Sequence, residues 1–102
     1  MDVVKLRDYC LSDSHPRGRH KARVFRSRLG LTRADAELLR LALLEAVRMR
    51  PEDLRPTEGD QYGQRYVLDF DLTGAAGSAA VRSAWVVLAN EDVLRFVSCY
   101  VL

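Results

Sequence analysis

His15-Pro16-Arg17-Gly18-Arg19-His20-Lys21-Ala22-Arg23-Val24-Phe25-Arg26-Ser27-Arg28-Leu29-Gly30 is the stretch from which the fold of this chain can be predicted. Pro16 fixes φ, and Gly18 accepts backbone conformations that other residues avoid, so the first residues predict a turn. The residues after it predict a helix that ends at Gly30, because glycine is a frequent stop at the carboxyl end of a helix.

The predicted helix has two different surfaces. Ala22, Phe25 and Leu29 are spaced by three and four residues, so they share one face and can pack against a core. The basic residues of the helix point elsewhere, and no acidic residue occurs between Asp13 and Asp35. One short helix would therefore join a core face to a basic surface.

Charge is unevenly distributed along the chain. Residues 1–50 carry twelve Lys or Arg and six Asp or Glu, whereas residues 51–102 carry four and eight. This asymmetry indicates a surface for an anionic partner on the first half. The alternative is an ordinary solvated face, because exposed arginines on helices are common.

Two further helical segments flank the basic helix. Residues 1–11 predict one or two helical turns, and Thr32 with Asp35 resembles a capping box at the start of a long helix over residues 33–49. We expect this long helix to be the most buried, because its apolar stripe is wide. The stripe contains Leu38, Leu39, Ala42, Leu43, Ala46 and Val47, extended by Leu41 and Leu44.

The second half of the chain predicts a surface loop followed by strands. Residues 50–64 are rich in proline, glycine and acidic residues, which is typical of a loop. Alternating apolar residues predict a strand over 65–72, a hairpin turn at 74–77, and further strands over 78–88 and 95–102. The expected fold is a single α+β domain over residues 1–102, with two to three N-terminal helices packed on a three- to four-stranded antiparallel meander sheet.

One face of this sheet is predicted to remain open. We place Tyr66, Leu68, Phe70 and Leu72 toward the helices, and Ala80, Ala84, Val86 and Leu88 likewise on the second strand. An arginine, hydroxyl groups and aromatic rings on the other face would suit a phosphate and a stacked base. The alternative is that the tryptophan and tyrosine are packing residues. The expected open face contains Arg65, Ser83, Trp85, Ser98 and Tyr100.

A general acid–base group is available beside two cations. His15 titrates near neutral pH, and Lys21 and Arg65 could stabilise charge on a phosphate. The alternative is a solvated turn histidine and a helix-surface lysine. The residues expected to contact nucleic acid are Arg17, Arg19, His20, Arg23, Arg26 and Trp85.

The chain shows no signature of a metal, a cofactor or a membrane span. Cys10 and Cys99 lack metal-ligand spacing and are expected to be reduced thiols of the core. We expect no cofactor and no metal. No apolar stretch is long enough to cross a bilayer, and no leader is recognised, so we expect a cytoplasmic protein.

The sequence resembles a bacterial domain family of unknown function. The resemblance rests on a Lys-Tyr helix at Lys5–Tyr9, on the pattern HPxGxxKAxxFxxxLG over His15–Gly30, and on two later motifs, Val81–Trp85 and Ser98–Val101. Members of that family occur free-standing and at the carboxyl ends of polymorphic toxins and filamentous adhesins. They are similar to small ribonuclease toxins of the barnase–EndoU–colicin–RelE kind.

This resemblance implies the toxin of a bacterial toxin–antitoxin system, a metal-independent endoribonuclease that acts on cellular RNA and is checked by a cognate small antitoxin or immunity protein. It implies His15, Lys21, Ser83, Ser98 and Tyr100 as catalytic residues, whereas Arg65 comes only from the strand pattern. Because this cleavage would require the ribose 2′-hydroxyl, which DNA lacks, DNA would not be cleaved. Two alternatives remain open: a nucleic-acid-binding domain without catalysis, and a protein-interaction module of the antitoxin or immunity type that uses the acidic segment 52–60.

Overall fold

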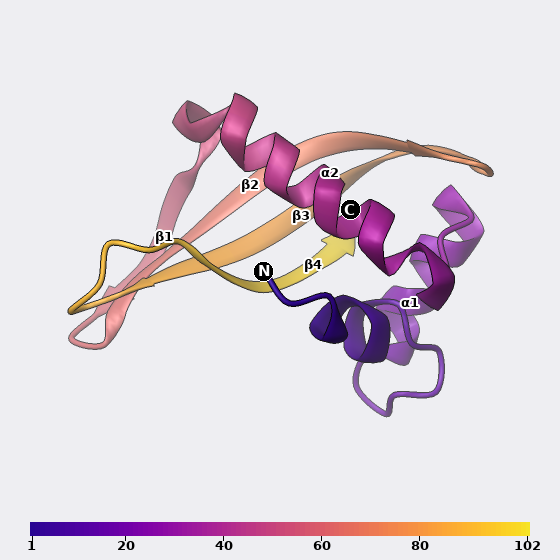
Figure 1. The fold of residues 1–102 in the computed structure, drawn as a ribbon, viewed down its shortest axis with the longest axis horizontal. Helices are drawn as coiled ribbons and strands as arrows, with labels where there is room; N and C mark the ends of the chain where they lie inside the picture. Colours follow the sequence, from indigo (N-terminus) through magenta and orange to yellow (C-terminus); the bar gives the residue numbers. More distant parts are fainter.

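The computed structural model describes residues 1–102, with helices in the first half and a sheet in the second (Figure 1). A helical turn precedes the basic stretch, whose helix runs without a break from α1 into a wider π-helical turn. A single 3-10 turn then leads into the long helix. The elements are η1 (Leu6–Cys10), α1 (Arg19–Val24), η2 (Phe25–Leu29), η3 (Arg33–Asp35), α2 (Ala36–Met49) and η4 (Pro51–Asp53).

Four strands form one antiparallel sheet in the order in which they occur in the chain. They are β1 (Arg55–Asp60), β2 (Gly63–Gly74), β3 (Gly77–Leu88) and β4 (Arg95–Val101). The predicted α+β class and the antiparallel meander are confirmed. The predicted capping box of Thr32 and Asp35 is also present, and Glu37–Arg40 and Glu45–Arg48 form ion pairs along α2.

The prediction of a loop over residues 50–64 is wrong in part, because Arg55–Asp60 forms β1 and pairs with β2. Every residue of β1 is exposed, so the strand has no buried face to reveal it in the sequence. Pro56 and Gly59 are acceptable there because β1 is an edge strand whose register shifts between them.

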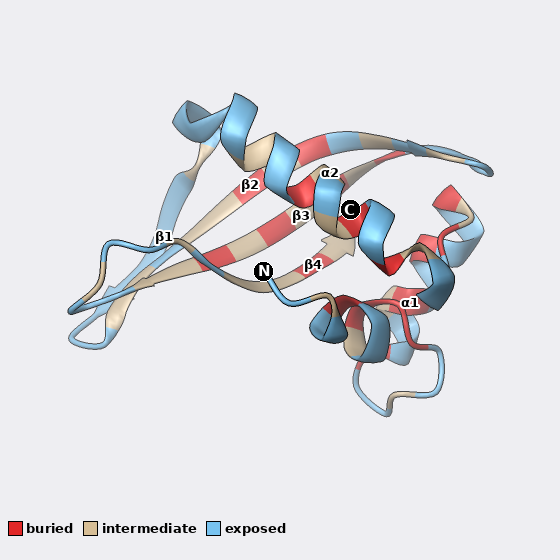
Figure 2. Ribbon diagram, viewed as in Figure 1, coloured by how far each residue is buried: buried red, intermediate tan, exposed pale blue.

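The core lies between the helices and one face of the sheet (Figure 2). Phe25 and Leu29 of the basic helix and Leu43 of α2 are fully buried, as are Leu68 and Val81 of the sheet. Full burial of such a side chain contributes about 1.5–3 kcal/mol each. The predicted core face of the basic helix is therefore confirmed.

The long helix α2 is less buried than its sequence predicts. Leu39 and Leu43 are fully buried, but the side chains of Leu38, Leu41 and Leu44 are 49%, 54% and 36% exposed. The reason is geometric: α2 lies across one face of the sheet, and no other element covers its outer side (Figures 1 and 2). A leucine-rich helix in this position buries only the side that meets the strands.

The end of the basic helix is joined to the tip of the β2–β3 hairpin. Gly30 adopts a φ of +71° and ends the helix where the sequence predicts. The carbonyl of Leu29 accepts a hydrogen bond from the amide of Ala76 over 3.3 Å. Gly74 is packed so closely against this carbonyl that a Cβ would collide with its oxygen. No helix of the structure has both the length and the apolar character needed to cross a membrane.

Candidate nucleic-acid interface

The turn that precedes α1 is built by the side chain of His15. Its Nδ1 accepts hydrogen bonds from the amides of Arg17 and Gly18, over 3.1 and 3.2 Å. The backbone carbonyl of His15 accepts the amide of Arg19 over 3.0 Å, which starts the helix. The ring lies edge-on to Tyr9, with ring centroids 4.7 Å apart. The turn predicted from His15, Pro16 and Gly18 is confirmed.

These contacts determine what His15 is free to do. Because Nδ1 faces two N–H donors, its lone pair is engaged and the neutral ring carries its hydrogen on Nε2. A general base needs a free ring nitrogen, and Nδ1 is occupied by these two hydrogen bonds. Proton uptake at Nδ1 would break both of them and thereby the turn. Gly18 is buried against η1, where a Cβ would collide with the carbonyl oxygen of Tyr9. The His-Pro-x-Gly motif therefore positions the basic helix.

The basic helix presents most of its cations without acidic partners. Arg19, Arg23 and Arg26 follow helical spacing along one side of the helix and are exposed, next to the buried face of Phe25 and Leu29. Arg26 has the one ion pair of this surface, 3.5 Å from Asp13 and well exposed. Exposed cations without a partner carry a positive potential that attracts anions. The remaining predicted contact residues Arg17 and His20 are exposed as well, as is Arg28.

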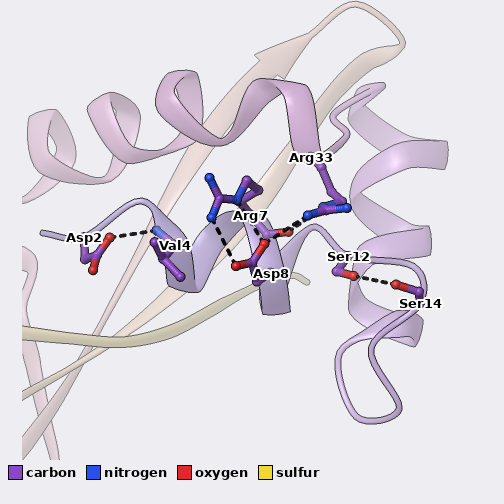
Figure 3. Close-up of polar contacts among 7 residues, drawn as sticks. All are labelled: Asp2, Val4, Arg7, Asp8, Ser12, Ser14 and Arg33. Carbon is purple, nitrogen blue, oxygen red and sulfur yellow. Dashed lines mark hydrogen bonds and ion pairs between the residues drawn. The ribbon is translucent and has the colours of Figure 1, made fainter.

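Two nearby arginines outside this helix share an acidic partner, as Figure 3 shows. Arg7 lies 2.9 Å and Arg33 3.0 Å from the same Asp8 carboxylate. Arg33 also donates from Nε to the carbonyl of Arg7 over 3.2 Å. Their hydrogen bonds, that from Arg7 first, lower the pKa of Asp8. Most of the uncompensated positive charge of the amino-terminal half therefore lies on residues 17–28.

A row of polar side chains connects the basic helix with the sheet. The Nζ of Lys21 lies 5.0 Å from the ring centroid of Tyr100 on β4, a cation–π distance. Arg82 of β3 is the register partner of both Tyr100 and Asp69. It donates to both oxygens of Asp69 over 2.8 Å, and Arg55 reaches the same carboxylate over 3.1 Å. The hydrogen bonds from Arg82 lower the pKa of Asp69.

The predicted open face is wrong for β3. Ser83 and Trp85 are buried on the helix side, together with Ala79 and Val81. Ser83 pairs with Leu68, which faces the core as predicted. If β3 presented its other face to the helices, the charge of Arg82 would be buried without a partner. On the outer face, Arg82 forms an ion pair with Asp69. Ser83 and Trp85 therefore lie in the core and not on the outer face of the sheet.

Two other predicted residues differ in how close they lie to this row. Arg65 is exposed but pairs with Val86, four residues along β2 from Asp69, or about 13 Å at the rise of a strand. Ser98 is half-buried, with its Oγ 4.0 Å from the Sγ of Cys10. Of the six residues predicted to be catalytic, the structure brings Lys21 and Tyr100 into direct contact.

Sequence reasoning missed a cluster around Cys10. Both cysteines are free and fully buried, as predicted for core thiols. Hydrogen bonds from Cys99 first, then from Ser98, together with the charge of Lys21, lower the pKa of Cys10 to about 6. The hydrogen bond with Cys10 and burial raise the pKa of Cys99. No three His, Cys, Asp or Glu side chains meet in a way that could hold a metal ion.

Comparison with known proteins identifies a family. The chain belongs to the family described as Domain of unknown function (DUF6883), which matches residues 1–102. No curated protein and no solved structure matches it. The similarity to ribonuclease toxins therefore stays a prediction from the sequence motifs.

Proposed function

We propose that this protein binds RNA through the exposed face of the helix Arg19–Leu29 and the adjoining edge of β4. The observation that carries the proposal is the set of exposed arginines that lack an acidic partner on one short helix. Phosphate contacts by lysine and arginine supply most of the affinity for nucleic acid that does not depend on sequence. The cations of this surface without an acidic partner are Arg17, Arg19, Arg23 and Arg28. Arg26 also belongs to the surface but forms an ion pair with Asp13.

The row beside the helix supports a single-stranded ligand. The ring of Tyr100 is half-buried at the β4 edge, beside the ammonium group of Lys21. Aromatic rings next to cations stack on unpaired bases while the cations meet the phosphates. Arg82, the register partner of Tyr100, is held by Asp69, so it adds little free charge to this row. This arrangement favours RNA in which bases are unpaired.

Binding is tested with a labelled single-stranded RNA by fluorescence anisotropy at several salt concentrations. The triple variant Arg19→Gln, Arg23→Gln and Arg26→Gln removes three charges from the proposed surface. We expect its affinity to fall about tenfold or more, and its log–log salt slope to fall by about two.

The control removes the same net charge from the long helix. Arg40 and Arg48 lie on α2 and Arg50 follows it directly, outside both the basic helix and β4, so their replacement by glutamine is expected to leave binding nearly unchanged. Equal losses in both triple variants would contradict a localised interface. Failure of the wild-type protein to bind RNA would contradict the proposal itself.

Cleavage is a second candidate function, favoured by the contact between Lys21 and Tyr100. In metal-independent cleavage, a base takes the 2′-hydroxyl proton and the 2′-oxygen attacks phosphorus. The 5′-oxygen then leaves with a proton, and a 2′,3′-cyclic phosphate remains. Lys21 would stabilise the charge and Tyr100 would donate to the leaving oxygen. His20 makes no hydrogen bond within the protein and is exposed, so it is a freer base than His15.

This second function is that of a toxin restrained by a cognate small antitoxin or immunity protein. Induced expression in a bacterium, followed by inspection of total RNA, tests it. Wild type should stop growth and leave fragments with cyclic phosphate ends, whereas Lys21→Ala and Tyr100→Phe should be harmless while still folded. Harmless expression of wild type with intact RNA would leave binding as the sole function.

A further inference from the structure

The outer face of α2 is an apolar surface that no part of the chain covers (Figure 2). Leu38, Leu41 and Leu44 follow one another at intervals of three residues and are 49%, 54% and 36% exposed. Met49, at the end of the helix, is 61% exposed. Single exposed leucines are ordinary, but a contiguous stripe on one helix marks an interaction surface.

The charges around this stripe show which partner fits it. The helix has a midpoint between Ala42 and Leu43, and residues at equal distances on the two sides of it have matching properties: apolar with apolar, and acidic with basic. Leu41 lies as far from that midpoint as Leu44, and Glu37 lies as far from it as Arg48. When two copies of α2 pack antiparallel about a two-fold axis, residue pairs at equal distances from the midpoint face each other.

We propose that α2 forms a two-fold interface between two copies of this chain, with Leu41 of one copy against Leu44 of the other. Glu37 of each copy then meets Arg48 of its partner, once at each end of the interface. Within one chain, Arg40 holds Glu37 and Glu45 holds Arg48, over 2.6 Å in each pair. The interface would thus join two existing ion pairs into a chain of alternating charges on each side of the leucines.

The size of the surface determines how strong this association is. One helix face is smaller than the roughly 800 Å² per partner of a standard stable interface. We therefore expect a dimer that exchanges rapidly, with a dissociation constant on the order of tens of micromolar. The interface involves none of the residues proposed to bind RNA, so it stands or falls separately from that function.

Analytical ultracentrifugation of the full chain, from about 5 to about 500 µM, measures the association directly. Wild type should shift from monomer to dimer across this range. Leu41→Glu should weaken dimerisation at least about tenfold, because it places two like charges in the centre of the interface. The matched control Met49→Glu introduces the same charge at the edge of the stripe and should have a much smaller effect.

A charge exchange tests the antiparallel arrangement. Glu37→Arg and Arg48→Glu should each weaken the dimer, and the double variant should recover part of the loss because the pair is restored with its signs reversed. Circular dichroism confirms that each variant is folded. A wild-type chain that stays monomeric throughout overturns the proposal, and so does a dimer that Leu41→Glu leaves unchanged. A double variant no better than the single ones overturns the antiparallel register.

Discussion

Trp85 donates its indole N–H to the hydroxyl oxygen of Ser83 over 2.8 Å. The two residues are two positions apart on β3, so their side chains lie on the same face of the strand. Ser83 in turn donates to the carbonyl of Leu68 over 2.7 Å. Both side chains are buried, so this short chain satisfies every polar atom that the tryptophan and the serine bring into the core. Ser83 is thereby part of the core of this fold, and the catalytic role that the family resemblance implies for it stays a prediction.

Replacing Ser83 by alanine should destabilise the protein without affecting RNA binding. The variant leaves the indole N–H of Trp85 buried without an acceptor, which costs about 1–3 kcal/mol. Urea unfolding monitored by tryptophan fluorescence measures the free energy of unfolding, and anisotropy measures binding. Lost RNA binding or cleavage in a variant of unchanged stability would show that Ser83 acts in the site after all.

The role of His15 can be separated from catalysis by two substitutions. Asparagine has a short side chain with an acceptor that can bond backbone amides in turns, as Nδ1 of His15 does with Arg17 and Gly18. His15→Ala should lower the free energy of unfolding by about 1–2 kcal/mol, and His15→Asn should restore part of that loss. Neither should abolish RNA binding while the protein is folded. A folded His15→Asn variant that binds RNA normally but no longer cleaves it would contradict this purely structural role.

The pair of Asp69 and Arg82 should make stability depend on acid pH. The pKa of Asp69 is lowered in the folded protein from an ordinary value of 3.8. Its contribution is therefore fully present above about pH 4 and is lost as the pH falls through the lowered folded value. Asp69→Asn should destabilise the protein at neutral pH by about 1–2 kcal/mol, and the difference from wild type should shrink below pH 4. A difference that does not change with pH would contradict the assignment of the ion pair.

Much of the fold follows from short-range patterns in the sequence. The turn at His15, the core face of the basic helix and the end at Gly30 depend on local chemistry, and all three are found. The alternation along β2 likewise places Leu68 and Phe70 in the core. Strand β1 could not be predicted, because an exposed edge strand is defined by pairing with β2 and not by a pattern of its own.

The sequence contains a signal that indicates which side chains of β3 face the core, although the prediction above does not use it. Asp69 and Arg82 each lie five residues from the paired glycines Gly74 and Gly77. In a tight hairpin such positions are partners, and opposite charges there indicate an outer face. The same register places Ser83 opposite the core residue Leu68. By contrast, the contact of Cys10 with Ser98 joins segments far apart in the chain, and no spacing in the sequence indicates it.

The thiol of Cys10 should titrate well below an ordinary cysteine. Hydrogen bonds from Cys99 and Ser98 and the charge of Lys21 favour the thiolate and lower its pKa from 9.0 to about 6. Thiolate absorbance near 240 nm should therefore appear with a midpoint near pH 6 in the folded protein, and Cys10→Ala should remove it. Cys99→Ala deletes the strongest of these hydrogen bonds and should raise the midpoint.

Stability should follow the same titration. Because the folded pKa of Cys10 lies below the unfolded one, its contribution is complete above about pH 9 and is lost as the pH falls toward 6. The pKa of Cys99 is raised instead, so its contribution is present below about pH 9 and declines above it. Between about pH 6 and 9, the free energy of unfolding of wild type should therefore rise relative to that of Cys10→Ala, as urea unfolding at several pH values would measure. A constant difference across this range, with no thiolate absorbance below pH 8, would show that Cys10 stays protonated in the core.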